Sequence, residues 1–173
     1  IVTMAMMVIT RGLIMVYTEG IPLTGLSNPS FQAFGQGFVG FVPMPVLVTI
    51  LTFAAVYFLL YQTRFGRYTL SIGSNPEAAR LVGIRIDRIK IAVYALTGFL
   101  AALSGVLLTS RLEAAMPEAG EGYELDVIAA VVMGGTSLAG GKASLLGTAA
   151  GAVLMAVVRN GLNILNVNTF WHQ

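Results

Sequence analysis

The chain has 173 residues, of which 56% are hydrophobic and 10% are charged, and its formal net charge at pH 7 is +2. Soluble globular proteins carry roughly 25% charged residues, so this composition, with a mean hydropathy of +0.81, predicts a membrane protein. Six of the ten Lys and Arg residues crowd into one loop, which excludes a nucleic-acid-binding face, and the absence of cysteine excludes disulfides and thiolate metal sites.

The first segment, Ile1–Thr18, is apolar except for Arg11 and predicts a membrane helix. A charge inside an apolar helix marks a functional position by default. Alternatively, Arg11 extends its charge toward the membrane surface, or it caps a helix that breaks at Gly12. A functional role and a structural role both stay open for Arg11.

The next residues, 19–43, are rich in Gly, Pro, Ser, Asn and Phe and contain no Lys or Arg, so we expect an irregular connection. The chain starts without Met and ends at Gln173 without a basic flank. We therefore expect an internal fragment of a longer membrane protein.

Two long uncharged runs, Pro45–Gln62 and Ile91–Ser110, have 18 and 20 residues. Each is about long enough to cross a bilayer as a helix, which takes roughly 20 residues. The loop between them, Thr63–Lys90, is basic, and the positive-inside rule predicts that it is cytoplasmic. The following acidic segment, Arg111–Asp126, is expected outside. The loop's basic residues are Arg64, Arg67, Arg80, Arg85, Arg88 and Lys90.

A short helix is predicted inside this loop. Asn75 and Pro76 form a helix-start signal, and Glu77 stands where the positive end of the helix dipole favours an acid. Gly83 is placed to end the helix in a backbone conformation that larger residues resist.

The last third of the chain contains a Gly-rich break. Val127–Met133 is too short to span a bilayer alone, and Gly134–Lys142 follows it, so segment 123–135 is either a short crossing or a re-entrant hairpin. Lys142 predicts that this loop is cytoplasmic. Segment 144–165 is the last span. Small residues recur every four positions at Ala143, Gly147 and Gly151, and in the earlier span at Gly98 and Ala102, and they predict close helix packing.

Together these segments predict an all-α membrane protein, a polytopic transmembrane helix bundle. We expect a single transmembrane domain over residues 1–173. It would have four to five membrane segments, a short cytoplasmic helix and a broken Gly-rich segment. The expected segments are 1–18, 45–62, 91–110, 123–135 and 144–165.

No catalytic, cofactor-binding or metal-binding residues are expected in this chain. Gly35–Gly40 matches G-x-G-x-x-G, but prolines follow it and a membrane span stands where the acidic residue of a dinucleotide site belongs. The loop ending at Lys142 lacks the first glycine and the final Ser or Thr of a P-loop. His172 is the only histidine. The acidic residues Glu121, Glu124 and Asp126 are interpreted as a solvated external face.

The residues Glu77-Ala78-Ala79 with Gly83, at E-A-A-x-x-x-G spacing, resemble the cytoplasmic coupling loop of ABC-importer permeases. The wider pattern is similar to the ribose-type monosaccharide permease family and covers nearly the whole chain. It is carried by Thr63–Tyr68, Asn75–Arg80, Gly122–Ser137 and Asn160–Asn163.

The resemblance implies a multi-pass subunit of the bacterial inner membrane, of which this chain is about the C-terminal half. It would work as a pair with an identical or different second permease. Two cytoplasmic ABC ATPases would bind ATP and Mg²⁺, and a periplasmic sugar-binding protein would deliver the substrate. The permease itself, embedded in the lipid bilayer, would not be an enzyme.

The coupling helix would contact the ATPase, with Ala78 and Ala79 facing it and Glu77 capping the helix, and would tilt spans 45–62 and 91–110. The expected ATPase-coupling residues are Pro76, Glu77, Ala78, Ala79, Arg80, Leu81 and Gly83, and possible path or structural residues are Arg11, Gly134, Gly135, Thr136 and Ser137.

Three alternatives stay open. The first is a permease of the same superfamily for branched-chain amino acids or another small solute. The second is an ATPase-independent channel or secondary transporter, which the scarcity of acidic or histidine residues inside the spans disfavours. The third is a membrane anchor without a transport path.

Overall fold

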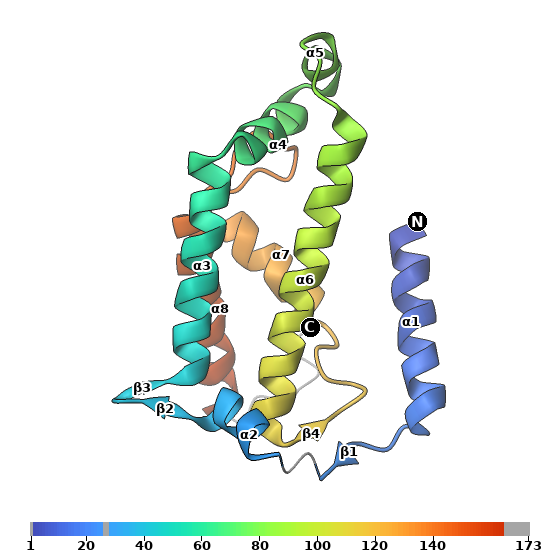
Figure 1. Cartoon of the computed structure of the whole chain (residues 1–173), viewed down its shortest axis with the longest axis vertical. Coiled ribbons are helices and arrows are strands. Elements are labelled where there is room, and N and C mark those ends of the chain that lie inside the picture. The colour runs from blue at the N-terminus through green and yellow to red at the C-terminus, as the bar shows by residue number, and fades with distance from the viewer. Residues whose placement is uncertain (1, 26–27, 165–173) are drawn as a thin grey trace. The chain divides into compact units, whose positions relative to one another are not determined.

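The computed structural model describes residues 2–25 and 28–164 and is mainly helical (Figure 1). The elements are α1 (Val2–Thr18), β1 (Leu23–Thr24), α2 (Pro29–Gln36), β2 (Phe38–Val39), β3 (Val42–Pro43), α3 (Met44–Gln62), α4 (Arg64–Ser74), α5 (Pro76–Leu81), α6 (Ile86–Leu112), β4 (Ala114–Ala115), α7 (Tyr123–Met133) and α8 (Leu145–Ile164). The predicted all-α class is confirmed. The expected end of the last span at residue 165 lies outside the described residues.

The structure forms two compact units, and the division falls within α3 and α6. The first unit contains residues up to 54 together with 96–119. The second contains residues 55–95 together with those from 120 onward. The expectation of one permease domain stays a prediction.

In the first unit, the expectation of an irregular segment over residues 19–43 is wrong for Pro29–Gln36, which form α2. The side chain of Asn28 accepts a hydrogen bond from the Ser30 amide at 3.1 Å, so Asn28 caps α2. At the other end of α2, Gly35 lies against Ser110, which is fully buried and donates a hydrogen bond to the carbonyl of Phe31. The cap and this contact with α6 make the segment helical despite its composition.

Two short antiparallel ladders complete the first unit. β1 pairs with β4, with Leu23 opposite Ala115, and β2 pairs with β3 in a hairpin. The hairpin turns at Gly40, whose φ of +65° suits glycine. The glycines of the G-x-G-x-x-G match therefore serve close packing and a tight turn, as expected.

Helix α1 runs through Gly12 without a break, so the idea that Arg11 caps a helix ending there is wrong. Arg11 is half-buried, and its role stays a prediction. With 17 residues, α1 is shorter than the helices that qualify as candidate spans.

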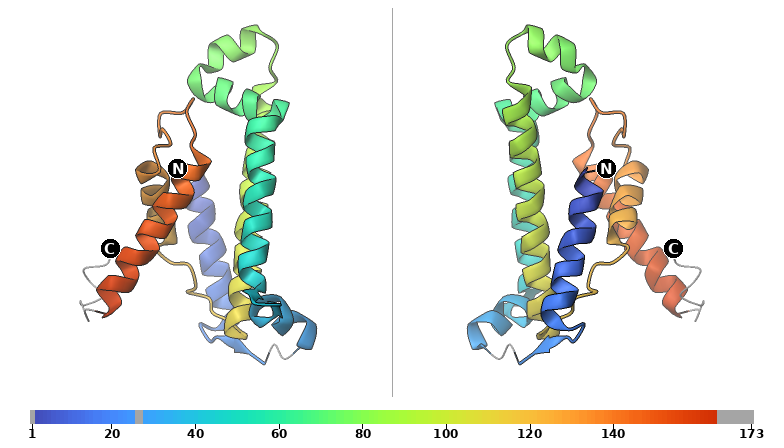
Figure 2. Two further views of the ribbon diagram at one scale, coloured as in Figure 1. Left: turned by 90° about the vertical axis from the view of Figure 1, so that its left-hand side faces the viewer. Right: turned by 90° about the vertical axis from the view of Figure 1, so that its right-hand side faces the viewer.

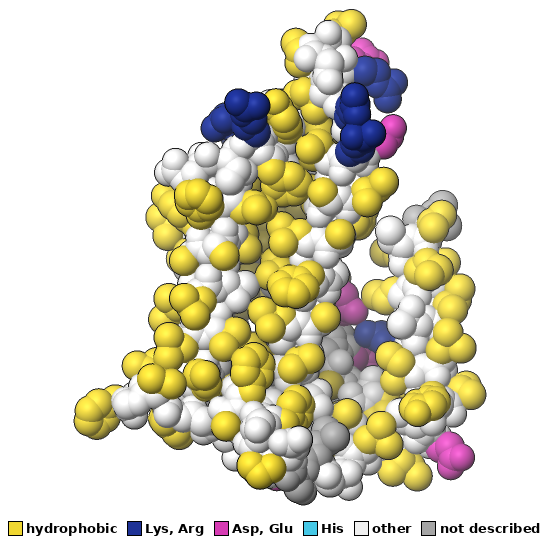
Figure 3. Space-filling view, in the orientation of Figure 1, with side chains coloured by type: hydrophobic (Ala, Val, Ile, Leu, Met, Phe, Trp, Pro, Cys, Tyr) yellow, Lys and Arg dark blue, Asp and Glu magenta, His cyan; other side chains and the backbone are white. Residues whose placement is uncertain are grey.

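Three helices in the described chain are long and apolar enough to cross a membrane: α3, α6 and α8 over Leu145–Leu162. Their mean hydropathies are 2.1, 2.1 and 1.5. Their apolar side chains are largely exposed, and the space-filling view shows this on the faces of α3 and α6 (Figure 3). Such a surface is suited to lipid or to other helices.

Helix α6 begins at Ile86, five residues before the expected span. The uncharged run begins at Ile91, whereas the helix has already formed around Asp87, Arg88 and Lys90. An acid in the first turn favours the helix through its dipole. The uncharged run therefore predicts the apolar part of α6 but not the residue at which the helix begins.

In the second unit, α7 and α8 pack side by side in a hairpin, seen in orange and red in Figure 2. Gly147 lies on the backbone of Gly134, and Gly151 lies on the backbone of Ala130. The predicted close packing is confirmed at Gly147 and Gly151, whereas at Gly98 a Cβ atom would meet none of the described residues within 4 Å. Helix α7 has 11 residues and rises about 16 Å, about half the thickness of a bilayer core.

Candidate functional site

The loop between α3 and α6 contains α4 and α5, and we call residues 64–90 the α4–α5 module. Helix α5 starts because the side chain of Asn75 accepts a hydrogen bond from the Ala78 amide at 3.0 Å. Pro76 occupies the first helical position, where its missing N–H costs nothing. The cap is thus Asn75, and the expectation that Glu77 caps the helix is wrong. Glu77 lies in the first turn, where it interacts favourably with the helix dipole.

Helix α5 ends in a Schellman motif at Gly83. Gly83 has a φ of +82°, and its amide donates to the carbonyl of Arg80 at 3.0 Å. The amide of Ile84 donates to the carbonyl of Ala79 at 3.1 Å. These two bonds satisfy carbonyls that the end of a helix leaves unpaired, so α5 is a defined single element despite having only six residues.

Ala79 faces the interior of the module. Only 3% of it is exposed, and it forms a small core with Ile72 and Ile86, against which Ile84 and Ile89 pack. The expectation that Ala79 faces a partner protein is wrong. A small side chain is needed there because α5 lies close to the module's own isoleucines.

The outward-facing residues of α5 are different. Leu81 is 88% exposed and Val82 is 75% exposed, although both are apolar. Ala78, Glu77 and Arg80 are also exposed. In Figure 3, Lys and Arg side chains gather around this end of the second unit. The module therefore presents a small apolar tip beside basic groups.

The Gly-rich break after α7 is an ordered turn. Gly135 has a φ of +81°, its amide donates to Val132, and the amide of Thr136 donates to Val131. This is a second Schellman motif, and it explains why the helix stops. The hydroxyl of Thr136 then accepts a hydrogen bond from the Ser144 amide at 3.1 Å, which ties the two ends of the loop together.

The loop is closed by local bonds as well. The amide of Ser137 donates to the carbonyl of Lys142 at 3.1 Å. Ser144 caps α8, because its side chain accepts a hydrogen bond from the Gly147 amide at 3.1 Å. The four residues named from the sequence, Gly134 to Ser137, therefore shape the turn, and any role in a transport path stays a prediction.

The α4–α5 module contacts this turn directly, which the sequence did not indicate. A Cβ atom at Gly73 would lie 2.7 Å from the amide nitrogen of Gly141, and one at Gly140 would lie 2.5 Å from the carbonyl oxygen of Gly73. Two backbones therefore touch where only glycine leaves room. Glycines that contact each other from distant parts of the chain carry no local signal.

A second link joins the end of α3 to the start of α8. The hydroxyl of Tyr61 donates to the carbonyl of Ala143 at 3.1 Å and accepts from the amide of Leu145 at 3.2 Å. The hydroxyl thus uses both of its hydrogen-bonding capacities on one turn of backbone. The α7–α8 hairpin is consequently held at its Gly-rich end by two different helices.

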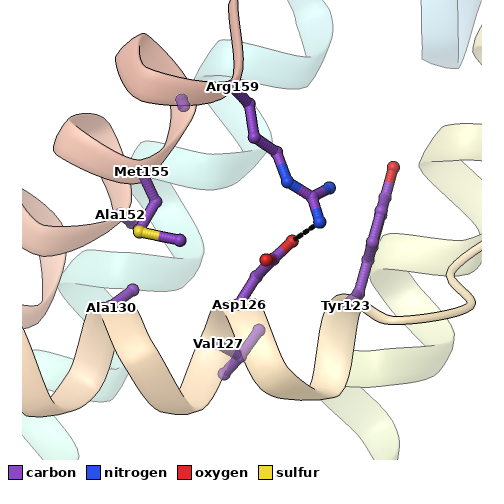
Figure 4. Close-up of a pocket in the computed structure, with 8 residues that line it drawn as sticks. Tyr123, Asp126, Val127, Ala130, Ala152, Met155 and Arg159 are labelled. Carbon is purple, nitrogen blue, oxygen red and sulfur yellow. Dashed lines mark ion pairs between the residues drawn. The ribbon is translucent and has the colours of Figure 1, made fainter. Parts of the chain in front are cut away.

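A pocket of about 220 Å³ lies between α7 and α8 (Figure 4). Asp126 and Arg159 form an ion pair across it, and the guanidinium carbon of Arg159 lies 5.5 Å from the centre of the Tyr123 ring. The interpretation of Asp126 as part of a solvated acidic face is wrong, because its carboxylate binds the arginine of α8. An acid at the start of one apolar segment and an arginine inside the next are the sequence signal that this pair offers.

Comparison with known proteins decides the family. A family model described as a branched-chain amino acid transport system / permease component matches residues 1–173. The chain belongs to this permease family. Family members are described as components of transport systems, and the three helices long and apolar enough to cross a membrane agree with that description.

The relatives include sugar permeases. The ribose import permease of Bacillus subtilis (strain 168) is 49% identical over 172 residues, which cover 99% of this chain and 53% of the relative. The ribose import permease of Escherichia coli (strain K12) is 48% identical over 176 residues, covering 100% of this chain and 55% of the relative. The resemblance to ribose-type permeases is confirmed.

A third relative, the xylose transport system permease of Escherichia coli (strain K12), is 49% identical over 130 residues, or 75% of this chain and 33% of the relative. The chain spans about half the length of the ribose permeases that it matches. No solved structure gives a significant match.

Proposed function

We propose that the full-length protein is the membrane-spanning permease subunit of an ATP-driven importer, and that it moves a ribose-type monosaccharide. The observation that carries this proposal is the near 50% identity to two ribose import permeases over 99–100% of the chain. A periplasmic binding protein would deliver the sugar. A second permease, identical or different, would complete the path in the inner membrane.

In this proposal, the α4–α5 module binds a cytoplasmic ATPase, which holds the ATP and Mg²⁺. The exposed apolar tip, Leu81 and Val82, would enter an apolar groove of the ATPase. The neighbouring Arg80 would meet its acidic groups. Ala79 would act from inside the module by keeping α5 seated on Ile72 and Ile86.

Movement of α5 would reach the transport path through the backbone contact of Gly73 with Gly140 and Gly141. That contact leads to the α7–α8 hairpin, which packs tightly through Gly147 and Gly151. A rigid hairpin that moves as one body is the type of element that switches between two states. The hairpin would thus respond together with α3 and α6.

A second candidate substrate class is the branched-chain amino acids, because the matching family model is described by them. The sugar proposal is preferred because the ribose and xylose permeases share 48–49% of their matched residues with this chain. Such a level of identity relates these chains more specifically than a broad family description does.

Reconstitution tests the proposal. The full-length permease is placed in liposomes with its cognate ATPase and solute-binding protein, and uptake of labelled ribose, xylose and leucine is followed with and without ATP. We expect ATP-dependent uptake of a pentose and none of leucine. ATP-dependent uptake of leucine alone would support the second candidate, and ATP-independent uptake of any of the three would contradict an ATP-driven importer.

A further inference from the structure

We propose that the pocket between α7 and α8 is a transit site for the solute, and that it takes a neutral, polyhydroxylated molecule the size of a monosaccharide. The inference rests on the proposed function and adds where the solute contacts the permease and through which groups. The polar groups of the pocket are Tyr123, Asp126 and Arg159 (Figure 4).

The polar groups come from two helices and converge on one point. Tyr123 and Asp126 are three residues apart on α7 and therefore share a face of that helix. Arg159 reaches them from α8, where it lies inside a candidate membrane span. A charged residue within an apolar span is costly and indicates a functional position.

Among the residues that the structure describes, the ion pair joins one nitrogen of Arg159 to one oxygen of Asp126. A guanidinium has five N–H donors and a carboxylate accepts about four hydrogen bonds, so both groups can bind further partners. The side chains of Arg159 and Asp126 are 36% and 24% exposed, so neither is fully buried by the ion pair. Adjacent hydroxyls of a sugar, each a donor and an acceptor, match such a pair.

The remaining walls are apolar, and three of the five residues are alanines: Val127, Ala130, Ala152, Met155 and Ala156. A volume of about 220 Å³ lies below the roughly 300–1,000 Å³ of pockets for drug-sized ligands, which suits a small solute. A monosaccharide has C–H faces as well as hydroxyl edges. The alanines and the Tyr123 ring provide surfaces for those faces.

The charge balance distinguishes this solute from an amino acid. Asp126 and Arg159 compensate each other, so the site as a whole has no net charge to attract an ammonium or carboxylate group. A zwitterionic amino acid would have to break the ion pair between Asp126 and Arg159 and bind each of them with its own charged groups. The charged groups of the amino acid would also lose their water, which costs free energy. A neutral polyol binds without breaking the pair.

The test uses the full-length permease reconstituted with its ATPase and binding protein. Tyr123→Ala removes the ring, and Tyr123→Phe keeps it. We expect Tyr123→Ala to lower sugar uptake by about three- to tenfold, the range that an aromatic contact supports, and Tyr123→Phe to lose less. The ATPase rate stimulated by loaded binding protein should persist in both variants. Leu125→Ala, on an exposed residue of α7 outside the pocket, is the matched control.

A second measurement separates contact with the sugar from packing. Asp126→Asn and Arg159→Lys are compared on ribose and 2-deoxyribose, each presented on saturating binding protein. A contact to a hydroxyl predicts that the variants change the ratio of the two uptake rates. A purely structural pair predicts an equal loss of both sugars, together with lower thermal stability, and that result would overturn the proposal.

Wild-type uptake and wild-type sugar ratios in Tyr123→Ala and Asp126→Asn would also overturn it. The proposed function fails in a different way, namely when the unmodified protein shows no ATP-dependent sugar uptake. A failure of the transit-site proposal therefore shows in the variants, and a failure of the proposed function shows in the unmodified protein.

Discussion

Gly83 is a residue whose identity depends on backbone conformation alone. Its φ is +82°, and a Cβ atom added there would meet nothing within 4 Å. Two hydrogen bonds that end α5 depend on this conformation. A larger residue at position 83 therefore has room for its side chain but must adopt a strained backbone.

We expect Gly83→Ala to destabilise the end of α5 by roughly 1 kcal/mol, because alanine resists the left-handed conformation. Gly83→Asn should cost less, because asparagine tolerates it. Hydrogen exchange of the amides of residues 79–84, measured on the full-length protein in lipid nanodiscs, reports the difference. Equal protection in the two variants would show that the backbone conformation is not the cause.

At the scale of elements, the contact between α4 and the Gly-rich turn decides how the α4–α5 module is joined to the α7–α8 hairpin. Gly73 is a helical residue without a special backbone conformation, so a substitution there tests the close approach alone. Gly105, in α6, is also helical and has open space around it, which makes it the matched control.

Gly73→Ala should push the turn away from α4 and lower ATP-driven uptake several-fold while the protein still inserts in the membrane. Overpacking of this kind costs about 1–3 kcal/mol. Gly105→Ala should have normal uptake, because alanine is the better helix former. Uptake and ATPase rate are measured together on reconstituted protein. Uptake at the wild-type level in Gly73→Ala would exclude this contact from the coupling route.

At the scale of the whole molecule, the distribution of charge predicts orientation. The α4–α5 module is basic, and the segment between α6 and α7 is acidic. Lys and Arg near the ends of spans are retained on the cytoplasmic side. The two segments should therefore lie on opposite sides of the membrane.

Single cysteines test this orientation, because this part of the protein has no cysteine of its own. In intact cells, we expect an impermeant thiol reagent to label Ala119→Cys and not Arg85→Cys, since both positions are exposed and the proposed topology puts only Ala119 outside. Labelling of Arg85→Cys should appear only after the membrane is opened. Labelling of Arg85→Cys in intact cells would contradict the proposed topology.

The sequence by itself determined the class of the protein, the long apolar helices and both ends of α5. These features are local: they depend on runs without charge, on Asn75 and Pro76 at a helix start, and on Gly83 at its end. The family resemblance was available for the same reason, since its motifs are short and ordered along the chain. Local patterns gave wrong predictions at two places. The Gly- and Ser-rich composition around α2 predicted an irregular segment, and the charged residues at the start of α6 hid the true beginning of that helix.

Only the tertiary structure decided which residues meet. It buried Ala79 on Ile72, left Leu81 exposed and brought Gly73 to Gly140. It also paired Asp126 with Arg159 across two helices. The physical reason is that the free energy of such contacts comes from neighbours that are distant in sequence, and in a chain of mostly apolar residues hydrophobicity alone does not choose among them.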